Sequence, residues 1–261
     1  MIRLNYIKNF FPAGLHNNPT FQKYMVKEYL QLAMLDFLSS THYIRKINFI
    51  GGTNLRLVKG IDRFSEGLDF DCKNFSREEF FEMTDAVVQF LQGHGLEVAT
   101  HDRENPRLKA FCRNIYFPEL PYKLGLTGHK DERFLIKIEC EDQQVNYKNT
   151  LTKINGCGFF FPFPVPVDEV LCSMKISAML SRQKGRDFYD TMFLLSQTQP
   201  DYKFLAERNK IHNIQELKNA VAEILKTVDL KIKKRDFEHL LFFRKNSERI
   251  LFADDFFQML R

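Results

Sequence analysis

Several features that would define a class of protein are missing from this 261-residue sequence. It has no apolar run of eighteen residues, which is about the length that a membrane-spanning helix needs. Its first six residues show neither the apolar core nor the cleavage-site pattern of a secretory signal. We therefore expect a cytoplasmic protein with no membrane partner.

Disulfide and metal-binding patterns are also missing. The five Cys never form a CxxC pair, and the seven His show no HxH or HxxxH spacing. These absences argue against a disulfide framework, a zinc site and a His-based metal site, and they favour reduced thiols. The cysteines are Cys72, Cys112, Cys140, Cys157 and Cys172.

The charge and aromatic content set two further expectations. There are 38 basic and 33 acidic residues, which gives a net charge of +5. So mild an excess permits a polyanionic partner such as RNA without requiring one. Trp is absent, but the 27 Phe predict an aromatic-rich core.

Strand patterns occupy the first part of the chain and helical patterns the second, which predicts an α+β fold. We expect a mixed-sheet domain with an N-terminal helix over 1–165 and an all-helical domain over 166–261. Apolar spacing predicts strands at 46–50, 68–72, 95–102, 109–117 and 132–140, an extended segment at 159–166, and helices at 20–40, 53–59, 76–92, 168–183, 187–197, 213–227, 233–243 and 248–260.

A glycine turn follows the first predicted strand. Gly51, Gly52 and Thr53 lead from this strand into a short helix. The unpaired N–H groups at a helix N-terminus favour phosphate, glycine lets a ligand approach the backbone, and a Thr hydroxyl adds a donor. Taken alone, the turn also fits an ordinary strand–helix connection.

Two aspartates on the next strand strengthen the phosphate interpretation. Asp69 and Asp71 are two residues apart, so their carboxylates point to the same face of the strand. Carboxylates held so close repel each other unless a cation lies between them, and Mg²⁺ prefers such ligands together with substrate phosphates. The alternative is a solvated strand face.

These segments resemble a known family. Residues 51–55 (GGTNL) and 63–71 (RFSEGLDFD) are similar to the GGT-x-L and R-x-S-x-D-x-D signature of AbiEii/AbiGii-type nucleotidyltransferases, relatives of the polymerase-β superfamily. Gly67 departs from the pattern, since the family more often has an acidic residue there. The resemblance implies a polymerase-β-like domain in which Asp69 and Asp71 bind metal, and in which the nucleotide is contacted by Gly51, Gly52, Thr53, Arg63 and Ser65.

A third carboxylate is expected near this pair, because metal-assisted nucleotidyl transfer uses one to orient or deprotonate the attacking hydroxyl. Glu139 lies on a strand whose alternation places it with Lys137, opposite the apolar residues. Family members often have an acidic residue at this place. The alternative is an exposed Glu139 paired with Lys137, and Glu141 and Asp142 are weaker candidates.

A second block, 168–190, combines basic and acidic residues at helical spacing. It resembles the family motif K-x-x-A-x-x-x-R-x-x-x-R-D-x-x-D. The resemblance implies that Lys175 contacts the triphosphate, that Arg182 and Arg186 bind nucleotide, and that Asp187 or Asp190 is catalytic. Spacing does not choose between these two aspartates, and a structural Arg186–Asp187 ion pair is the alternative.

Together these features predict in-line attack of an acceptor hydroxyl on the α-phosphate of an NTP, assisted by two Mg²⁺ held by Asp69, Asp71 and Glu139. The resemblance implies the toxin of a bacterial toxin–antitoxin or abortive-infection system, with a cognate antitoxin as partner. The acceptor would be a tRNA 3′ end or another RNA. The alternatives are a protein or small-molecule acceptor, as in antibiotic-modifying enzymes, or a non-catalytic nucleotide-binding module. The sequence does not give the oligomeric state.

Overall fold

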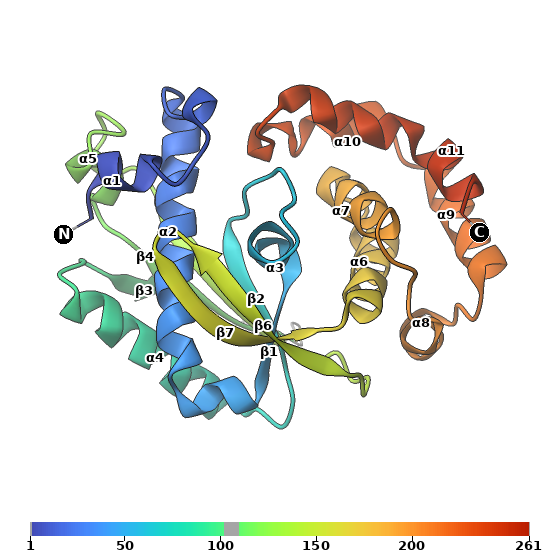
Figure 1. The fold of residues 1–261 in the computed structure, drawn as a ribbon, viewed down its shortest axis with the longest axis horizontal. Coiled ribbons are helices and arrows are strands. Elements are labelled where there is room, and N and C mark those ends of the chain that lie inside the picture. Colours follow the sequence, from blue (N-terminus) through green and yellow to red (C-terminus); the bar gives the residue numbers. More distant parts are fainter. Residues whose placement is uncertain (1, 102–109, 261) are drawn as a thin grey trace. The chain divides into compact units, whose positions relative to one another are not determined.

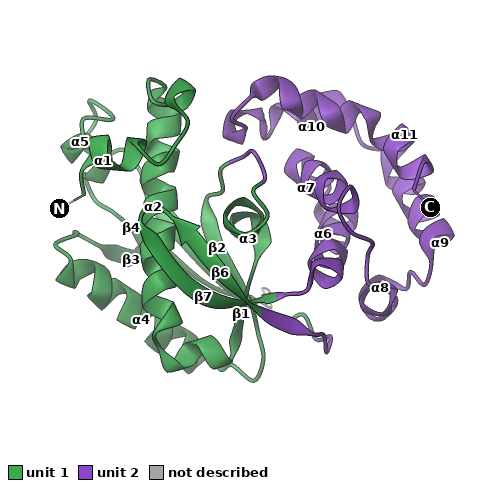
Figure 2. Cartoon of the chain, viewed as in Figure 1, with its two compact units in different colours: residues 1–60, 64–143, 151–165 green, residues 61–63, 144–150, 166–261 purple. Residues whose placement is uncertain are grey.

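A five-stranded mixed sheet occupies the centre of the first part of the chain, and helices make up the second part (Figure 1). The structure is a computed structural model that describes residues 2–101 and 110–260. Strands with flanking helices come first and helices alone follow, so the predicted α+β class is confirmed. The chain divides into two compact units (Figure 2). Unit 1 comprises residues 1–60, 64–143 and 151–165, and unit 2 comprises residues 61–63, 144–150 and 166–261.

The sheet of unit 1 has the strand order β1-β2-β5-β4-β3. The β2–β5 pair is parallel and the other three pairs are antiparallel. The last residue of the strand expected at 95–102 and the first residue of the strand expected at 109–117 lie outside the described residues. The strands are β1 Ile47–Ile50, β2 Gly67–Cys72, β3 Ala99–His101, β4 Phe111–Tyr116 and β5 Leu135–Glu141.

The two long helices of unit 1 begin at side-chain caps. Asn18 accepts the backbone N–H groups of Thr20 and Phe21 at the start of α2, and the predicted Ser76–Glu79 capping box begins α4. Stacking of Phe37 on Phe90, with ring centroids 4.6 Å apart, packs the two helices together. The helices of unit 1 are α1 Leu4–Lys8, α2 Pro19–Ser39, α3 Gly51–Leu57, α4 Arg77–Gly93 and α5 Leu120–Lys123, with the 3₁₀ turns η1 Ala13–Leu15 and η2 His42–Arg45.

A hairpin follows the main sheet. Its strands are β6 Asn149–Gly156 and β7 Phe159–Pro166. Cys157 and Gly158 connect them with φ angles of 49° and 86°, the left-handed pair that a type I′ hairpin turn requires. The sequence predicted an extended segment at 159–166 but not β6, because its side chains are mostly polar and exposed.

Phenylalanine rings fill the core of unit 1, as expected. Phe49 on β1, Phe70 on β2 and Phe163 on β7 are almost fully buried, and each pair of their ring centroids is 6.0 Å apart. Rings at such distances pack favourably beyond the gain from apolar burial alone. This cluster fixes β2, which carries both candidate metal-binding aspartates.

Unit 2 is helical after Asp168, as predicted, but the sequence did not predict the helix at Tyr202–Asn209, and two helices were placed wrongly. The helix expected at 233–243 overlaps α10 only at 233–235. Helix α10 begins earlier because Asp229 accepts the N–H groups of Lys231 and Ile232, and it ends at Arg235, after which the predicted span holds only a 3₁₀ turn at 238–240. The segment 248–260 is divided between a 3₁₀ helix and α11. The helices are α6 Asp168–Arg182, α7 Gly185–Leu195, α8 Tyr202–Asn209, α9 Ile214–Leu225, α10 Leu230–Arg235 and α11 Ala253–Gln258, with the 3₁₀ segments η3 Glu238–Leu240 and η4 Arg244–Phe252.

Two expected absences can be compared with the structure. All five cysteines are free thiols. Within residues 2–101 and 110–260, none of the helices combines the length and apolar character that crossing a bilayer requires.

The phenylalanine cluster yields a test of the core of unit 1. Phe163→Ala should lower the free energy of unfolding by about 3–5 kcal/mol, because it leaves a cavity against Phe49 and Phe70. Phe160→Ala is the matched control on the same strand, since Phe160 is 65% exposed, and it should change stability by less than about 0.5 kcal/mol. Urea unfolding measures both, and equal losses would contradict the proposed packing.

Candidate active site

The candidate acidic residues of unit 1 are brought together by the register of β2 on β5. Asp69 is paired with Glu139 and Asp71 with Glu141 in this parallel pair. Residues in register on neighbouring strands point to the same face of a sheet, so all four carboxylates lie on one face. We call these four residues the acidic face.

The opposite face of the same strands is apolar. Phe70, Ile138 and Cys140 alternate with the acidic residues and are at most 1% exposed. Burial, followed by the neighbouring Cys72, raises the pKa of the Cys140 thiol well above its usual value. The alternation predicted for β5 is therefore confirmed, and the core side of the sheet holds the acidic side in place.

The glycine turn lies directly against Asp69. Gly51 begins α3 with a φ angle of +79°, and a Cβ atom placed on it would lie 2.1 Å from Oδ2 of Asp69. A side chain would therefore collide with this carboxylate, and the backbone angle also favours glycine. The structure thus brings together two predicted features, the Gly51–Gly52 turn and Asp69.

Thr53, two residues after Gly51, attaches α3 to the first residue of β2. Its buried hydroxyl donates a hydrogen bond to the carbonyl of Gly67, so that hydroxyl fixes α3 to β2. The backbone N–H groups of the first turn are the phosphate donors that remain for this helix end. The structure also explains why position 67 is a glycine: a Cβ atom there would lie 2.7 Å from the carbonyl oxygen of Lys137.

Sequence reasoning missed one residue that supports this loop. Gln31 of α2 is 1% exposed, and its amide donates to the carbonyls of Ser65 and Gly67 at 3.2 Å each. Ser65 itself is buried. A lone Gln within an apolar helix gave no signal for this role.

Asp71 is fully buried, whereas Asp69 is partly exposed. The backbone N–H of Gln143 donates to Oδ1 of Asp71 at 2.8 Å. Asn48 is in register with Asp71 on β1 and is also buried. The two aspartates therefore share a face but differ in depth.

Glu139 pairs with Lys137 at 2.6 Å, which is the alternative that the sequence left open for it. Burial lowers the pKa of Lys137, but the hydrogen bond and charge of Glu139 outweigh this and raise it. Within the described part of the chain, no group of three or more His, Cys, Asp or Glu side chains is arranged to hold a metal ion. The pair Asp69 and Asp71 has the oxygen donors that a hard divalent cation prefers, to be completed by substrate phosphates.

Unit 2 contains a buried charge cluster built from three predicted site residues. Arg63 donates two hydrogen bonds of 2.7 Å to the carboxylate of Asp190, and Lys175 donates one of 2.9 Å. Asp190 is fully buried, Arg63 is 1% exposed and Lys175 is 7% exposed. Burial raises the pKa of Asp190, but Arg63 and Lys175 outweigh it and lower the value to about 2.

The other aspartate of the motif has a different environment. Asp187 is buried and accepts a 2.6 Å hydrogen bond from Arg182, whose side chain is about half exposed. It also accepts the backbone N–H of Lys184 at the start of α7. Arg186 lies in the first turn of the same helix and is partly exposed. Asp187 thus stabilises the helix start, while Asp190 holds Arg63 and Lys175.

A second network that the motif did not predict supports Arg63. Asp62 accepts a hydrogen bond from the Tyr189 hydroxyl at 2.6 Å and from the Asn246 amide at 2.5 Å. The carbonyl of Asp62 accepts the N–H of Phe242 at 3.0 Å. The segment 61–63 is thereby fixed to α7 and to the residues around η4, and no periodic pattern in the sequence indicates these long-range bonds.

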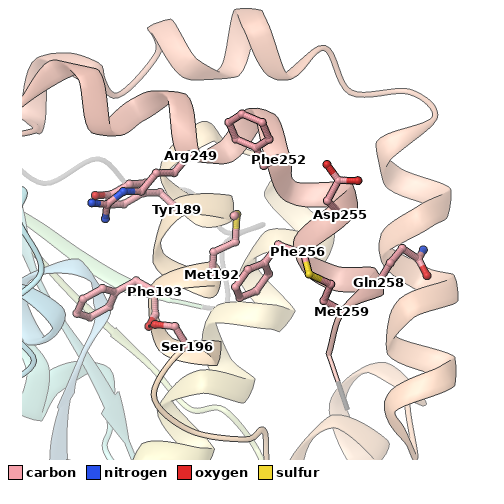
Figure 3. A pocket seen from close by; sticks show the side chains of 10 residues that line it. All are labelled: Tyr189, Met192, Phe193, Ser196, Arg249, Phe252, Asp255, Phe256, Gln258 and Met259. Atoms are coloured by element: carbon pink, nitrogen blue, oxygen red, sulfur yellow. The ribbon is translucent and has the colours of Figure 1, made fainter.

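An apolar pocket of about 750 Å³ is lined mainly by residues of α7, η4 and α11 (Figure 3). None of the predicted site residues lines it. Tyr189 connects it with the Asp62 network. The lining residues are Tyr189, Met192, Phe193, Ser196, Arg249, Phe252, Asp255, Phe256, Gln258 and Met259.

The fold is similar to that of solved structures, among them a nucleotidyltransferase toxin. MenT4, a nucleotidyltransferase toxin from Mycobacterium tuberculosis H37Rv, is similar with a TM-score of 0.61 at 16% identity, over 100% of this chain and 91% of that chain. JHP933 from Helicobacter pylori is similar with a TM-score of 0.56 at 17% identity, over 91% of each chain. At these identities the likeness shows a common nucleotidyltransferase-like fold.

The family is established by the sequence itself. No curated protein matches the chain, but residues 33–246 match the family model described as nucleotidyl transferase AbiEii toxin, type IV toxin–antitoxin system. The chain belongs to this family, which confirms the resemblance found in the two motifs. It is therefore a nucleotidyltransferase toxin, and membership of a toxin–antitoxin family implies an antitoxin partner.

The buried cluster of unit 2 predicts a specific pH dependence. The pKa of Asp190 is about 2 in the folded protein and near 3.9 when unfolded, so its ionisation stabilises the fold above pH 4, by about 2–3 kcal/mol. This stabilisation is lost as the pH falls from 4 towards 2. Asp190→Asn should remove that part of the pH dependence, which urea unfolding across pH 2–7 measures.

The same substitution leaves Arg63 and Lys175 buried without their shared carboxylate. At pH 7 it should cost about 3–5 kcal/mol, whereas Asp255→Asn at an exposed carboxylate should have little effect. Replacing Lys175 as well, in Asp190→Asn/Lys175→Met, should recover part of the loss. A double variant no more stable than the single one would contradict the ion cluster.

Proposed function

We propose that the acidic face of unit 1 catalyses transfer of a nucleoside monophosphate from an NTP to an acceptor hydroxyl, and that this reaction depends on Mg²⁺. The observation that carries the proposal is the contact of the Gly51 turn with Asp69. It places a helix start, which favours phosphate, beside carboxylates that favour a divalent cation. Family membership supports the reaction class.

In this reaction the acceptor oxygen forms a bond to the α-phosphorus, the bond from that phosphorus to pyrophosphate breaks, and the hydroxyl proton is released. Bound divalent cations would supply charge neutralisation at the attacking and leaving oxygens. Asp69 and Asp71 would hold these cations. Glu139 would orient or deprotonate the acceptor hydroxyl, with Lys137 fixing its carboxylate.

For unit 2 we propose nucleotide contacts from the family motif. Lys175 would contact the triphosphate, and Arg182 and Arg186 would add positive charge. Asp190 would act as a positioning residue, because it accepts hydrogen bonds from both Lys175 and Arg63 and so fixes the direction of the ammonium group. Asp187 would keep the start of α7 in place.

We further propose that the acceptor is an RNA, such as a tRNA 3′ end, and that the protein acts in the cytoplasm as the toxin of an abortive-infection system. The net charge of +5 is compatible with an RNA acceptor. A protein or small-molecule acceptor would give the same labelled-nucleotide chemistry with a different product, so the assay below separates these cases.

Incubation of the protein with each α-³²P-labelled NTP, Mg²⁺ and total RNA should transfer label to RNA. Asp69→Asn and Asp71→Asn should each reduce the transfer by at least about 100-fold, because each removes a carboxylate ligand. Asp131→Asn, an exposed site in the same unit, is the control and should keep full activity. Chelation of Mg²⁺ should stop the transfer and re-addition should restore it.

If the label appears in protein and not in RNA, the acceptor is a protein and the RNA proposal is wrong, while the assignment as a nucleotidyltransferase stands. Equal labelling by wild type and by the Asp69 and Asp71 variants, at matched folded fractions, would refute the assignment of the acidic face.

A further inference from the structure

Two basic segments that lie outside the family motifs contact each other in unit 2. Helix α10 has the sequence LKIKKR, and η4 begins with Arg244 and Lys245. The two elements contact each other, and Lys234 of α10 reaches Glu248 of η4 at 3.6 Å. We define the basic surface as Lys231 and Arg235, which share one side of α10, together with Arg244 and Lys245.

Helix α10 is also fixed against the start of α7, which carries the family motif. The N–H of Gly185 donates to Asp236 at 3.1 Å, and a Cβ atom on Gly185 would lie 1.9 Å from the carbonyl oxygen of Lys233. Glycine is therefore required for this approach. It brings α10 next to the start of α7 (Figure 1).

Three acidic side chains near α10 are already engaged in other interactions. Asp229 caps the helix, Asp236 accepts the N–H of Gly185, and Glu248 pairs with Lys234. By contrast, within residues 2–101 and 110–260 the four members of the basic surface have no side-chain hydrogen bond or ion pair. All four are exposed.

Large apolar side chains stand among these cations. Phe243, directly before Arg244, is 68% exposed, and Ile232 on α10 is 62% exposed. An exposed aromatic ring beside unpaired cations has the two features that single-stranded nucleic acids require, a stacking platform for a base and positive charge for phosphates. An acidic peptide would use the charges but would not require the ring.

We propose that this basic surface binds the RNA acceptor, with its cations on backbone phosphates and Phe243 stacked on an unpaired base. This inference rests on the proposed function, because it takes the acceptor to be RNA. It assigns RNA binding to a surface of unit 2. It also assigns base stacking to Phe243, which belongs to neither family motif.

The test measures RNA binding by fluorescence anisotropy and needs no turnover. The probe is a fluorescein-labelled RNA hairpin with a short single-stranded 3′ end. Lys231→Gln/Arg235→Gln/Lys245→Gln should weaken binding about 10-fold or more near 0.1 M salt. It should also reduce the slope of log Kd against log salt by about 2, since each phosphate contact on a single strand contributes about 0.7.

The matched control is Lys203→Gln/Lys210→Gln/Lys226→Gln, which removes the same charge from exposed positions of unit 2. It should change Kd by less than about two-fold. Phe243→Ala should weaken binding about five-fold or more with an unchanged salt slope, whereas Phe252→Ala, also exposed at 62%, should not.

Equal weakening by the two triple variants would overturn the basic surface, and so would unchanged binding by Phe243→Ala or displacement of the RNA by polyglutamate at equal charge. Nucleotide transfer is measured separately on the same variants. A surface variant that loses RNA binding but still binds NTP supports the inference. The Asp69→Asn variant should lose transfer but retain RNA binding. Catalysis by the acidic face and RNA binding by the basic surface can therefore fail independently.

Discussion

The close approach of the Gly51 backbone to the Asp69 carboxylate is the constraint on which the candidate site depends. No side chain fits between the start of α3 and β2 at this point. The turn therefore fixes a helix end and a carboxylate in one place. The β2–β5 register then adds Glu139 beside Asp69, and the phenylalanine cluster below the sheet keeps β2 from moving.

In unit 2 the main constraint is the burial of the Lys175 ammonium group. A buried ammonium is costly without a partner, and Asp190 supplies one while Arg63 occupies the rest of its carboxylate. Asp62, Tyr189 and Asn246 in turn fix the segment that carries Arg63. Asp190 and Arg63 thus stabilise the structure around Lys175, which is compatible with a role in orienting Lys175 towards a phosphate.

Much of the fold could be predicted from local patterns, because caps and alternation act over a few residues. The Ser76–Glu79 box and the alternation of β5 are examples. Strand β6 was missed because its side chains are mostly polar and exposed, so they show no apolar alternation. In the candidate site, the motif indicated Asp69, Lys175 and Asp190 individually. The supporting residues Gln31, Asp62 and Asn246 could not be predicted, since each forms hydrogen bonds to residues more than thirty positions away.

The most direct test of the central claim is the nucleotidyl-transfer rate of Gly51→Ala compared with that of Gly14→Ala, whose added Cβ meets open space. The account predicts that Gly51→Ala remains folded but loses at least about 100-fold in rate, because Asp69 must move away from the helix start. Gly14→Ala should retain the wild-type rate. A folded Gly51→Ala protein with an unchanged rate would contradict the claim that this contact builds the active site.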